Sequence, residues 1–534
     1  MMKHLFGILF STICFFVLPA FLGIRTLNVD KMKATLEEAT KVWDSKSLVT
    51  EEVEAPEDTL PELLTQEQID PEIEIPGVDL TREYREWMPP AYSKQEAALG
   101  YDQDTFKVSE NFRHRVNFWK RIYSQVTTDQ GLLHDTEDLR IVYGVIDFRE
   151  INSNSALSEG QKQRARRDLL KVQKQEISDR LLRISQAKEA KELQGEDLRY
   201  FQMFSHNDGQ NKFREAASLK RIRFQLGQAD RFLMGMYFSG KYLPEIESIF
   251  RAEGLPLELT RLPFVESSFN IYARSKVGAS GIWQFIRSTG RIYLKMDTIV
   301  DFRNDPIEAS RAAAKKLKSN YKLLGSWPLA LTAYNHGPAG VKRIVDKLKT
   351  QSIEEIIQNA TARRFGFASQ NFYSCFVAAL EIEEAADKFF KKPKWAPEMK
   401  YAEIRLKRPL HFKHLIAFFG ENEDLALQYN LYFQQAVRRG HRPIPAGYSI
   451  RLPPELVQVA MEQLDFLPAP QANKGESSRV GLGGIYLVES GDTLGALARK
   501  FGVSVRGIMD VNELASPRML RVGQQLVIPG LGAD

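Results

Sequence analysis

Cysteine is scarce in this sequence of 534 residues, since only Cys14 and Cys375 occur. Two cysteines allow at most one disulfide, which excludes a small disulfide-framework fold. An excess of one charge sign is also lacking, because 73 Lys and Arg face 68 Asp and Glu for a net charge of +5. So small a surplus over this length argues against a nucleic-acid-binding protein. With 43% hydrophobic and 26% charged residues, the composition is that of a folded chain.

Metal and phosphate chemistry also lack a signal in the sequence. The eight histidines are scattered, and His411 and His414 have no partners at a recognisable ligand spacing. No phosphate-cradling glycine loop is present. We therefore predict that the protein uses neither a metal nor a cofactor. Cys375 lies in an apolar stretch, which predicts a small buried hydrophobic residue rather than a nucleophile.

Charged residues are absent from Leu5 to Ile24, directly after a short basic flank at Lys3 and His4. This pattern is typical of an export signal, so we expect residues 1–25 to direct the chain to the periplasm or cell envelope. Two outcomes fit the segment: removal as a signal peptide, or retention as a membrane anchor, because about 20 apolar residues can span a bilayer.

Three further regions follow from composition and periodicity. Residues 26–91 include an acidic, proline-containing stretch without Lys or Arg, which predicts a disordered spacer. Residues 92–242 show helical spacing of apolar residues and include a charged segment, from Ser158 to Glu192, that predicts an amphipathic helix. The basic face of that helix is expected to be solvated, with contact to an anionic wall polymer or membrane as the alternative. Residues 465–484 are rich in Pro, Gly and Ser, which predicts a linker.

One helix in the central region has clear ends in the sequence. Asp305-Pro306-Ile307-Glu308 combines an N-cap acid, proline at the first helical position and Glu three residues after the cap. Gly325 predicts the end of the helix. Asp305 is therefore expected to cap a helix, whereas Asp297 and Asp301 stay open as further acidic candidates.

The last residues form a compact unit, 485–530, with the predicted order strand, helix, helix, strand. The run from Tyr486 to Leu494, with Phe501-Gly502 and Asn512, resembles a LysM module. That family binds glycans containing N-acetylglucosamine beside its first helix, which implies glycan contacts by Gly491, Asp492, Thr493 and Leu494.

A weaker copy of this pattern lies upstream. Phe419-Gly420 precedes Asn430 by the same interval as Phe501-Gly502 precedes Asn512. We interpret residues 399–454 as a degenerate LysM-like unit. Its Gly-Asp-Thr is replaced by Lys407-Arg408-Pro409, so we expect it to serve packing rather than sugar binding.

The chemically informative part is Leu262-Pro263-Phe264-Val265-Glu266-Ser267, where a carboxyl group stands among hydrophobic neighbours. Burial there raises the pKa of a carboxyl group, as a general acid at neutral pH requires. Gly281-Ile282-Trp283-Gln284 follows, with an aromatic and an amide suited to a sugar ring. Ala333-Tyr334-Asn335 ends an apolar helix. Each segment alone is also compatible with core packing or capping.

In this order, the three segments resemble the signatures of the family 1 lytic transglycosylases, especially the D type with C-terminal LysM modules. Trp283 stands where methionine is usual in the family, and His336, for which we favour a capping role, stands where alanine is usual. The resemblance implies a mainly α fold: a lysozyme-like helical catalytic domain at 243–395, preceded by the helical region and followed by small βααβ LysM modules.

For the chemistry, the resemblance implies cleavage of the MurNAc–GlcNAc β-1,4 bond of peptidoglycan glycan strands with formation of a 1,6-anhydro ring. Glu266 would act first as acid and then as base. Ser267 would orient Glu266, while Trp283, Gln284, Tyr334 and Asn335 would hold the substrate. Two other functions stay open: a muramidase that uses water on the same bond, and a non-catalytic peptidoglycan-binding scaffold.

Overall fold

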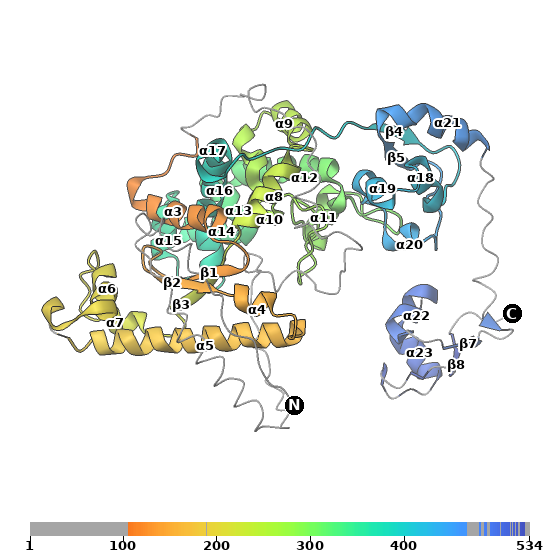
Figure 1. Ribbon diagram of the computed structural model, residues 1–534. Coiled ribbons are helices and arrows are strands. Elements are labelled where there is room, and N and C mark those ends of the chain that lie inside the picture. The colour runs from red at the N-terminus through yellow and green to blue at the C-terminus, as the bar shows by residue number, and fades with distance from the viewer. Residues whose placement is uncertain are drawn as a thin grey trace, which may run out of the picture. The chain divides into compact units, whose positions relative to one another are not determined.

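The computed structural model (Figure 1) describes residues 105–187 and 189–466 and, near the C-terminus, residues 480–481, 485–488, 492–501, 503–512, 514, 516–517, 520–521 and 524–528. The expected export segment 1–25, the whole expected spacer 26–91 and the first residues of the expected helical region, 92–104, lie outside the described residues. The described elements are mostly helices, which confirms the mainly α fold class. The chain divides into two compact units, Met1–Tyr401 with Asn430–Gln434, and Ala402–Tyr429 with Gln435–Asp534.

Helix α16 (Phe367–Glu384) forms the centre of the first unit. Nearly every residue between Asn371 and Leu380 is buried, and a helix that is apolar all round belongs in a core. Cys375 is fully buried there with a free thiol, and burial raises the pKa of that thiol, which confirms its predicted place in the core.

Four other helices complete this core. α16 is packed against α3 (Glu110–Ser124), α10 (Leu262–Ser267) and α13 (Trp327–His336), and α8 (Ala229–Ser239) packs against α3 and α10. Because α3 and α8 belong to this packed core, the structure does not separate at the boundary that we predicted between residues 242 and 243.

Helix α12 (Pro306–Leu324) has the ends that its sequence predicts. The Asp305 side chain accepts hydrogen bonds from the backbone N of Ile307 at 2.9 Å and of Glu308 at 3.1 Å. Gly325 ends the helix with φ 68°, a left-handed conformation that suits glycine. The remaining helices of the first unit's helical core are α9 (Leu243–Ala252), η4 (Leu257–Arg261), α11 (Arg287–Tyr293), η5 (Phe302–Asn304), α14 (Pro338–Leu348), α15 (Ile353–Asn359) and α17 (Ala386–Phe389).

An α/β insert lies between α3 and α8 in the sequence. Its three strands, in the antiparallel order β2-β1-β3, are β1 (Gln130–Asp135), β2 (Val142–Asp147) and β3 (Ile222–Leu226). Its helices are α4 (Arg149–Ser153), α5 (Glu159–Ile184), η3 (Ala190–Glu192), α6 (Gly195–Met203) and α7 (Lys212–Ala216). The insert buries a hydrophobic cluster of its own. In Figure 1 the long α5 runs beside this sheet.

The sheet corrects the prediction that residues 92–242 are a helical region. Its strands are only five or six residues long, and their burial does not alternate cleanly, so they carry little strand periodicity. The predicted amphipathic helix is confirmed as α5, whose N-cap Ser158 forms a capping box with Gln161. α5 buries Leu169, Ile177 and Leu181 against the insert's core.

The first part of the second unit contains two paired strands, with short helices between and after them. β4 (Ala402–Arg405) pairs antiparallel with β5 (Ser449–Leu452), and Arg451 of β5 forms an ion pair with Glu403 of β4 at 2.9 Å. The intervening and following helices are α18 (Phe412–Phe418), α19 (Glu423–Asn430), α20 (Gln435–Arg438), η6 (Pro454–Leu456) and α21 (Val457–Phe466).

The C-terminal part has the predicted strand-helix-helix-strand order, with β7 (Ile485–Leu487), α22 (Leu494–Phe501), α23 (Val505–Val511) and β8 (Gln525–Val527). A further strand, β6 (Val480–Gly481), pairs with β7, so these two residues of the predicted 465–484 linker belong to a sheet. Asn512 joins helix to strand: its side chain exchanges two hydrogen bonds of 2.7 Å with the backbone of Val527.

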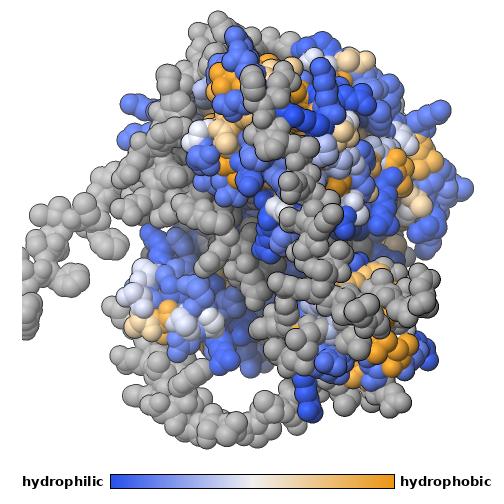
Figure 2. All heavy atoms as spheres, turned by 90° about the vertical axis from the view of Figure 1, so that its right-hand side faces the viewer, coloured by the Kyte–Doolittle hydropathy of each residue, from blue (hydrophilic) through white to orange (hydrophobic). Residues whose placement is uncertain are grey.

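Among the described residues, the helices are either too short or too polar to cross a membrane. Where described side chains are visible in Figure 2, hydrophilic residues predominate and hydrophobic residues form small groups.

Candidate active site

Glu266 lies in the last turn of α10. This short helix has Pro263 as its second residue, a position in the first turn where proline is well tolerated. The helix ends abruptly, because Ser268 and Phe269 both have positive φ angles, 50° and 54°. Such angles are costly for residues other than glycine and persist only where packing enforces them. Here α8 comes close: a Cβ added at Gly235 would lie 2.7 Å from the backbone oxygen of Ser268.

Glu266 keeps some exposed surface, yet burial raises the pKa of its carboxyl group to about 8. Lys316 of α12 acts in the opposite direction and lowers that pKa. In the described part of the chain, the carboxyl group makes no hydrogen bond or ion-pair contact of its own. It is therefore a carboxyl group that can stay protonated near neutral pH, as a general acid must.

The sequence analysis did not single out Lys316. Its Nζ donates a hydrogen bond to the backbone oxygen of Tyr334 at 3.0 Å and lies 3.4 Å from the centroid of that ring. Burial lowers the pKa of Lys316 to about 8, against the opposing influence of Glu266. The sequence could have indicated that Lys316 is buried, because helical spacing puts it on the face of α12 that buries Ala312 and Ala313.

Ser267, the last residue of α10, is hydrogen-bonded to the turn at residues 281–284. Ser267 Oγ donates to the backbone oxygen of Ile282 at 3.0 Å, so the serine ties α10 to this turn. Gly281 has φ 76°, and a Cβ there would lie 1.9 Å from the backbone oxygen of Arg303, which excludes any side chain.

Gln284 has a positive φ of 46°, and its Nε2 donates to the backbone oxygens of Gly281 at 2.8 Å and Ala273 at 3.2 Å. Its Oε1 is buried without a hydrogen-bond partner among the described residues. A buried acceptor without a partner carries a free-energy cost, and strained backbone with such a group is frequent at binding sites.

Trp283 requires a correction. We expected its ring to pack on a sugar, but the side chain has 0% exposed surface. The ring stacks on Phe250 with centroids 5.7 Å apart, and its Nε1 donates to Ser310 Oγ at 2.7 Å. A ring with both its face and its N–H occupied inside the core offers no surface to a ligand, so we remove Trp283 from the candidate substrate-binding residues.

Tyr334 and Asn335 lie at the end of α13. The Tyr334 hydroxyl donates to the backbone oxygen of Trp283 at 2.9 Å, and burial, followed by the charge of Glu266, raises its pKa well above the usual value. Asn335 Oδ1 accepts a hydrogen bond from Ser369 Oγ at 3.2 Å. Tyr334 therefore fixes the turn at 281–284, whereas Asn335 is oriented by α16.

His336 is the last residue of α13, but Gly337 is the residue that caps this helix. The His336 Nδ1 atom lies 3.1 Å from Ser369 Oγ, and the ring packs edge-on against Phe365. Burial, followed by the charge of Arg343, lowers the pKa of His336. Its side chain thus shares Ser369 with Asn335 rather than capping the helix.

The other acidic candidates of this region have structural partners. Asp297 accepts hydrogen bonds from the backbone N of Ile299 and of Val300, both at 2.8 Å. Asp301 is buried in an ion pair with Arg303 at 2.7 Å. With Asp305 capping α12, these three carboxylates are engaged in local structure.

A buried ion cluster lies elsewhere in the same unit. Arg261 of η4 pairs through Nη1 with Glu247 of α9 and through Nε with Glu383 of α16 at 3.3 Å. All three side chains are buried. The cluster therefore joins three elements of the unit with charged groups.

The four expected glycan contacts of the C-terminal unit differ in placement. Gly491 lies outside the described residues. Asp492 Oδ2 accepts a hydrogen bond from the Tyr486 hydroxyl at 2.8 Å, and Thr493 Oγ1 accepts one from the backbone N of Ala496 at 3.2 Å. Leu494 is 1% exposed in the hydrophobic core of this unit, so its side chain is structural and that part of the prediction is wrong.

Comparison with known families and proteins gives two domain matches: the transglycosylase SLT domain over residues 247–357 and the LysM domain over residues 486–529. The chain is 26% identical over 302 residues to the membrane-bound lytic murein transglycosylase D of Escherichia coli (strain K12), which covers 55% of this chain and 64% of that protein. It thus spans somewhat less than two thirds of that relative's length.

Two further relatives match shorter segments. The putative tributyltin chloride resistance protein of Alteromonas sp. (strain M-1) is 32% identical over 124 residues, 23% of this chain and 60% of that protein. The N-acetylmuramoyl-L-alanine amidase XlyA of Bacillus subtilis (strain 168) is 40% identical over 57 residues, 10% of this chain and 19% of that protein. The chain thus carries a transglycosylase SLT domain around Glu266 and a C-terminal LysM domain, the two families that its sequence motifs resemble.

Proposed function

We propose that this protein is a lytic transglycosylase that cleaves the β-1,4 bond between MurNAc and GlcNAc in peptidoglycan and leaves a 1,6-anhydro end. The observation that carries the proposal is the isolated carboxyl group of Glu266, whose pKa burial raises to about 8, within a transglycosylase SLT domain. The relative from Escherichia coli, a lytic murein transglycosylase by name, supports the same reaction.

In the first step, protonated Glu266 donates its proton to the glycosidic oxygen. The bond between C1 of MurNAc and O4 of GlcNAc breaks, and GlcNAc leaves with a 4-hydroxyl group. Positive charge develops at C1, where the N-acetyl group of MurNAc stabilises it. Glu266 is now a carboxylate, and the nearby Lys316 stabilises that charge because it favours the ionised form.

In the second step, the Glu266 carboxylate takes the proton from the C6 hydroxyl of MurNAc. O6 then bonds to C1 and closes the 1,6-anhydro ring. The proton has returned to Glu266 and no water is consumed. One carboxyl group suffices for both steps, whereas most glycoside hydrolases need two carboxyl groups. Asp297, Asp301 and Asp305 are held in local hydrogen bonds and an ion pair, which is consistent with a mechanism that uses a single carboxyl group.

The neighbouring residues have separate proposed roles. Gln284 Oε1, which lacks a partner, would accept a hydrogen bond from a substrate hydroxyl or amide. Ser267 and Tyr334 would position Glu266 indirectly, because each donates to the backbone of the turn at 281–284. Asn335 would hold the substrate from the end of α13, oriented by Ser369.

The LysM domain would hold the enzyme on glycan strands of its substrate, with Asp492 and Thr493 near the sugar. We also propose that residues 399–454 form a degenerate LysM-like unit, since β4, α18, α19 and β5 follow one another in the βααβ order. The extra helix α20 and the altered first turn favour packing over sugar binding for this unit.

The proposed location is the cell envelope, reached through the export signal expected at residues 1–25, which lie outside the described residues. Whether the segment is cleaved in the periplasm or kept as a membrane anchor is a matter for N-terminal sequencing of the mature protein. An intact Met1 in the membrane fraction would indicate an anchor.

The deciding experiment is mass spectrometry of purified peptidoglycan digested with the full-length protein. We expect 1,6-anhydroMurNAc ends. Reducing MurNAc ends would identify a muramidase that uses water, and an undigested wall to which the protein binds would identify a non-catalytic scaffold. The Glu266→Gln variant is the matched control, because it keeps the shape of the side chain and removes its acidity.

A further inference from the structure

A hollow of about 630 Å³ opens beside the end of α13. One wall begins at His336 and continues along the whole length of α14 to Leu348, and the other wall is the segment 359–364. Lys347 Nζ reaches Thr361 Oγ1 at 3.3 Å, so the two walls are joined by a hydrogen bond. We call this hollow the 336–364 pocket.

The charge of the 336–364 pocket has a single sign. Its lining includes Arg343, Lys347, Arg363 and Arg364, and no Asp or Glu among the described residues that form it. Asp346 of the same helix forms an ion pair with Lys342, and neither residue lines the pocket. The pocket is therefore electropositive.

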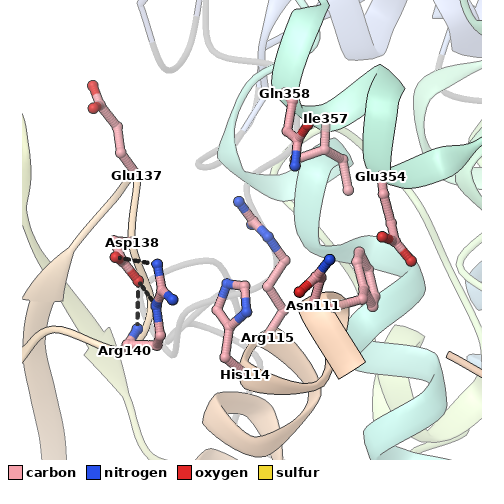
Figure 3. A pocket seen from close by; sticks show the side chains of 10 residues that line it. Asn111, His114, Arg115, Glu137, Asp138, Arg140, Glu354, Ile357 and Gln358 are labelled. Atoms are coloured by element: carbon pink, nitrogen blue, oxygen red, sulfur yellow. Dashed lines mark hydrogen bonds and ion pairs between the residues drawn. The ribbon is translucent and has the colours of Figure 1, made fainter. Parts of the chain in front are cut away.

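A second hollow is lined by charged side chains of both signs (Figure 3). It measures about 190 Å³ and lies among α3, α15 and the turn after β1. Its lining holds Arg115 and Arg140 together with Glu137, Asp138 and Glu354, and Asp138 pairs with Arg140 at 2.9 Å. Asp138 therefore neutralises Arg140 in this hollow, whereas the described lining of the 336–364 pocket contains no carboxylate.

Helix geometry directs the positive charge of the 336–364 pocket. Arg343 and Lys347 are one turn apart on α14, so their side chains lie on the same face. Gly337, Pro338 and Gly340 also line the pocket. This is the N-terminal end of an 11-residue helix, where the helix dipole favours anions.

The pocket adjoins the proposed active site. His336, which begins its wall, directly follows Asn335, and both side chains contact Ser369 Oγ. A group that branches from a sugar held by Asn335 is therefore well placed to reach the pocket. In peptidoglycan that branch is the peptide stem, which is attached through the lactyl group of MurNAc and carries free carboxylates.

We infer that the 336–364 pocket binds carboxylate groups of the peptide stems and makes the enzyme prefer glycan strands with charged stems. The inference rests on the proposed function, because it assigns a subsite to the same substrate. Guanidinium groups suit carboxylates, which they can bind through two parallel hydrogen bonds. Each exposed pair contributes little, so the preference is a matter of a few-fold in rate rather than of all or none.

The test compares two substrates made from one preparation of glycan strands. One keeps the natural stem carboxylates, and in the other they are converted to carboxamides, so the peptides stay in place without their charge. We expect kcat/KM of the parent enzyme to be about fivefold higher for the charged strands, which corresponds to two exposed ion pairs. We expect this ratio to decrease as salt is added.

The variant Arg343→Gln/Arg364→Gln should bring the ratio close to one. The variant Arg343→Lys/Arg364→Lys, which keeps the charge, should retain most of it. Lys315→Gln/Lys322→Gln is the matched control, because it removes two exposed cations of α12 that lie outside the pocket, and it should leave the ratio unchanged. A parent enzyme that treats both strands alike, or a glutamine variant that still prefers charged strands, would overturn the inference. Absence of anhydro ends in every digest would instead overturn the proposed function on which it rests.

Discussion

Two sets of buried carboxyl groups in the first unit have opposite surroundings. Glu247 and Glu383 both pair with Arg261, which lies between them. Glu266, only five residues beyond Arg261 in the sequence, makes no ion pair with the described residues, and burial raises its pKa to about 8. The difference lies in the distribution of partners rather than in burial alone. A paired carboxylate holds elements together, whereas an unpaired one is free to exchange a proton.

Lys316 makes the contrast more informative. It is close enough to influence Glu266 electrostatically, but its Nζ is hydrogen-bonded to the backbone of Tyr334. The cation therefore moderates the pKa of Glu266 without neutralising the carboxyl group in a direct ion pair. The following predictions test this comparison, beginning with the largest expected effect.

Replacing Glu266 by Gln should abolish the proposed activity. Because one carboxyl group serves in both steps, we expect a loss at the upper end of general acid–base catalysis, about 10⁴-fold in rate or ~5.5 kcal/mol. The release of anhydro ends measures it. Glu253→Gln is the control, since Glu253 pairs with Lys318 near the surface and should tolerate the change. Comparable rates for the Glu266 and Glu253 variants would refute the catalytic assignment.

Replacing Arg261 by Leu should instead destabilise the fold. The change leaves Glu247 and Glu383 buried without their common partner, and breaking a buried ion pair costs about 3–5 kcal/mol. Urea unfolding measures the loss. The exposed Arg311, which contacts Glu245 and Glu308, is the control, and its Leu variant should change the free energy of unfolding by less than about 1 kcal/mol. Equal effects would mean that the buried cluster has no special part in stability.

The Glu266→Gln variant should also be more stable than the parent protein. The folded-state pKa of Glu266 is raised from 4.5 to about 8, so the folded state binds more protons than the unfolded state between these values. The stability of the parent protein therefore falls as pH rises through this window, and Gln removes the effect. Allowing for the exposed part of the side chain, we expect a gain of about 1–2 kcal/mol at pH 8. The two unfolding curves should coincide below pH 4.5, and a constant difference at all pH values would contradict the assignment.

The smallest expected effect is that of Lys316→Met. Lys316 lowers the pKa of Glu266, so its removal should raise that pKa further. Because the protonated acid is the active form, the alkaline limb of the pH–rate profile should move to higher pH, by about one unit. Lys315→Met is the control, since Lys315 is exposed on the same helix. A shift of the limb to lower pH would show that Lys316 does not act on Glu266 through its charge.

Local signals in the sequence predicted local structure well. Asp305, Pro306 and Gly325 gave the two ends of α12, and the amphipathic pattern after Ser158 gave α5. These signals succeed because caps and helical periodicity depend on residues within one or two turns. The expectation that burial raises the pKa of Glu266 is confirmed, and it too came from hydrophobic neighbours that are adjacent in sequence.

The missed features depend on residues that are distant in sequence. The sheet order β2-β1-β3 joins strands that are separated by α5, α6 and α7. Trp283 looked suited to a sugar, but Phe250 and Ser310 enclose it. Neither contact can be predicted from the residues next to Trp283 in the sequence.

By itself, the sequence determined the mainly α class and the resemblance to transglycosylase SLT and LysM domains, and it singled out Glu266 as the candidate for the reactive carboxyl group that we propose. Only the tertiary structure decided which carboxyl groups are paired, that Lys316 lies near Glu266, and that four cations line the 336–364 pocket. The physical reason is that a residue type carries its own charge and shape, whereas desolvation and charge pairing arise from neighbours that folding brings together.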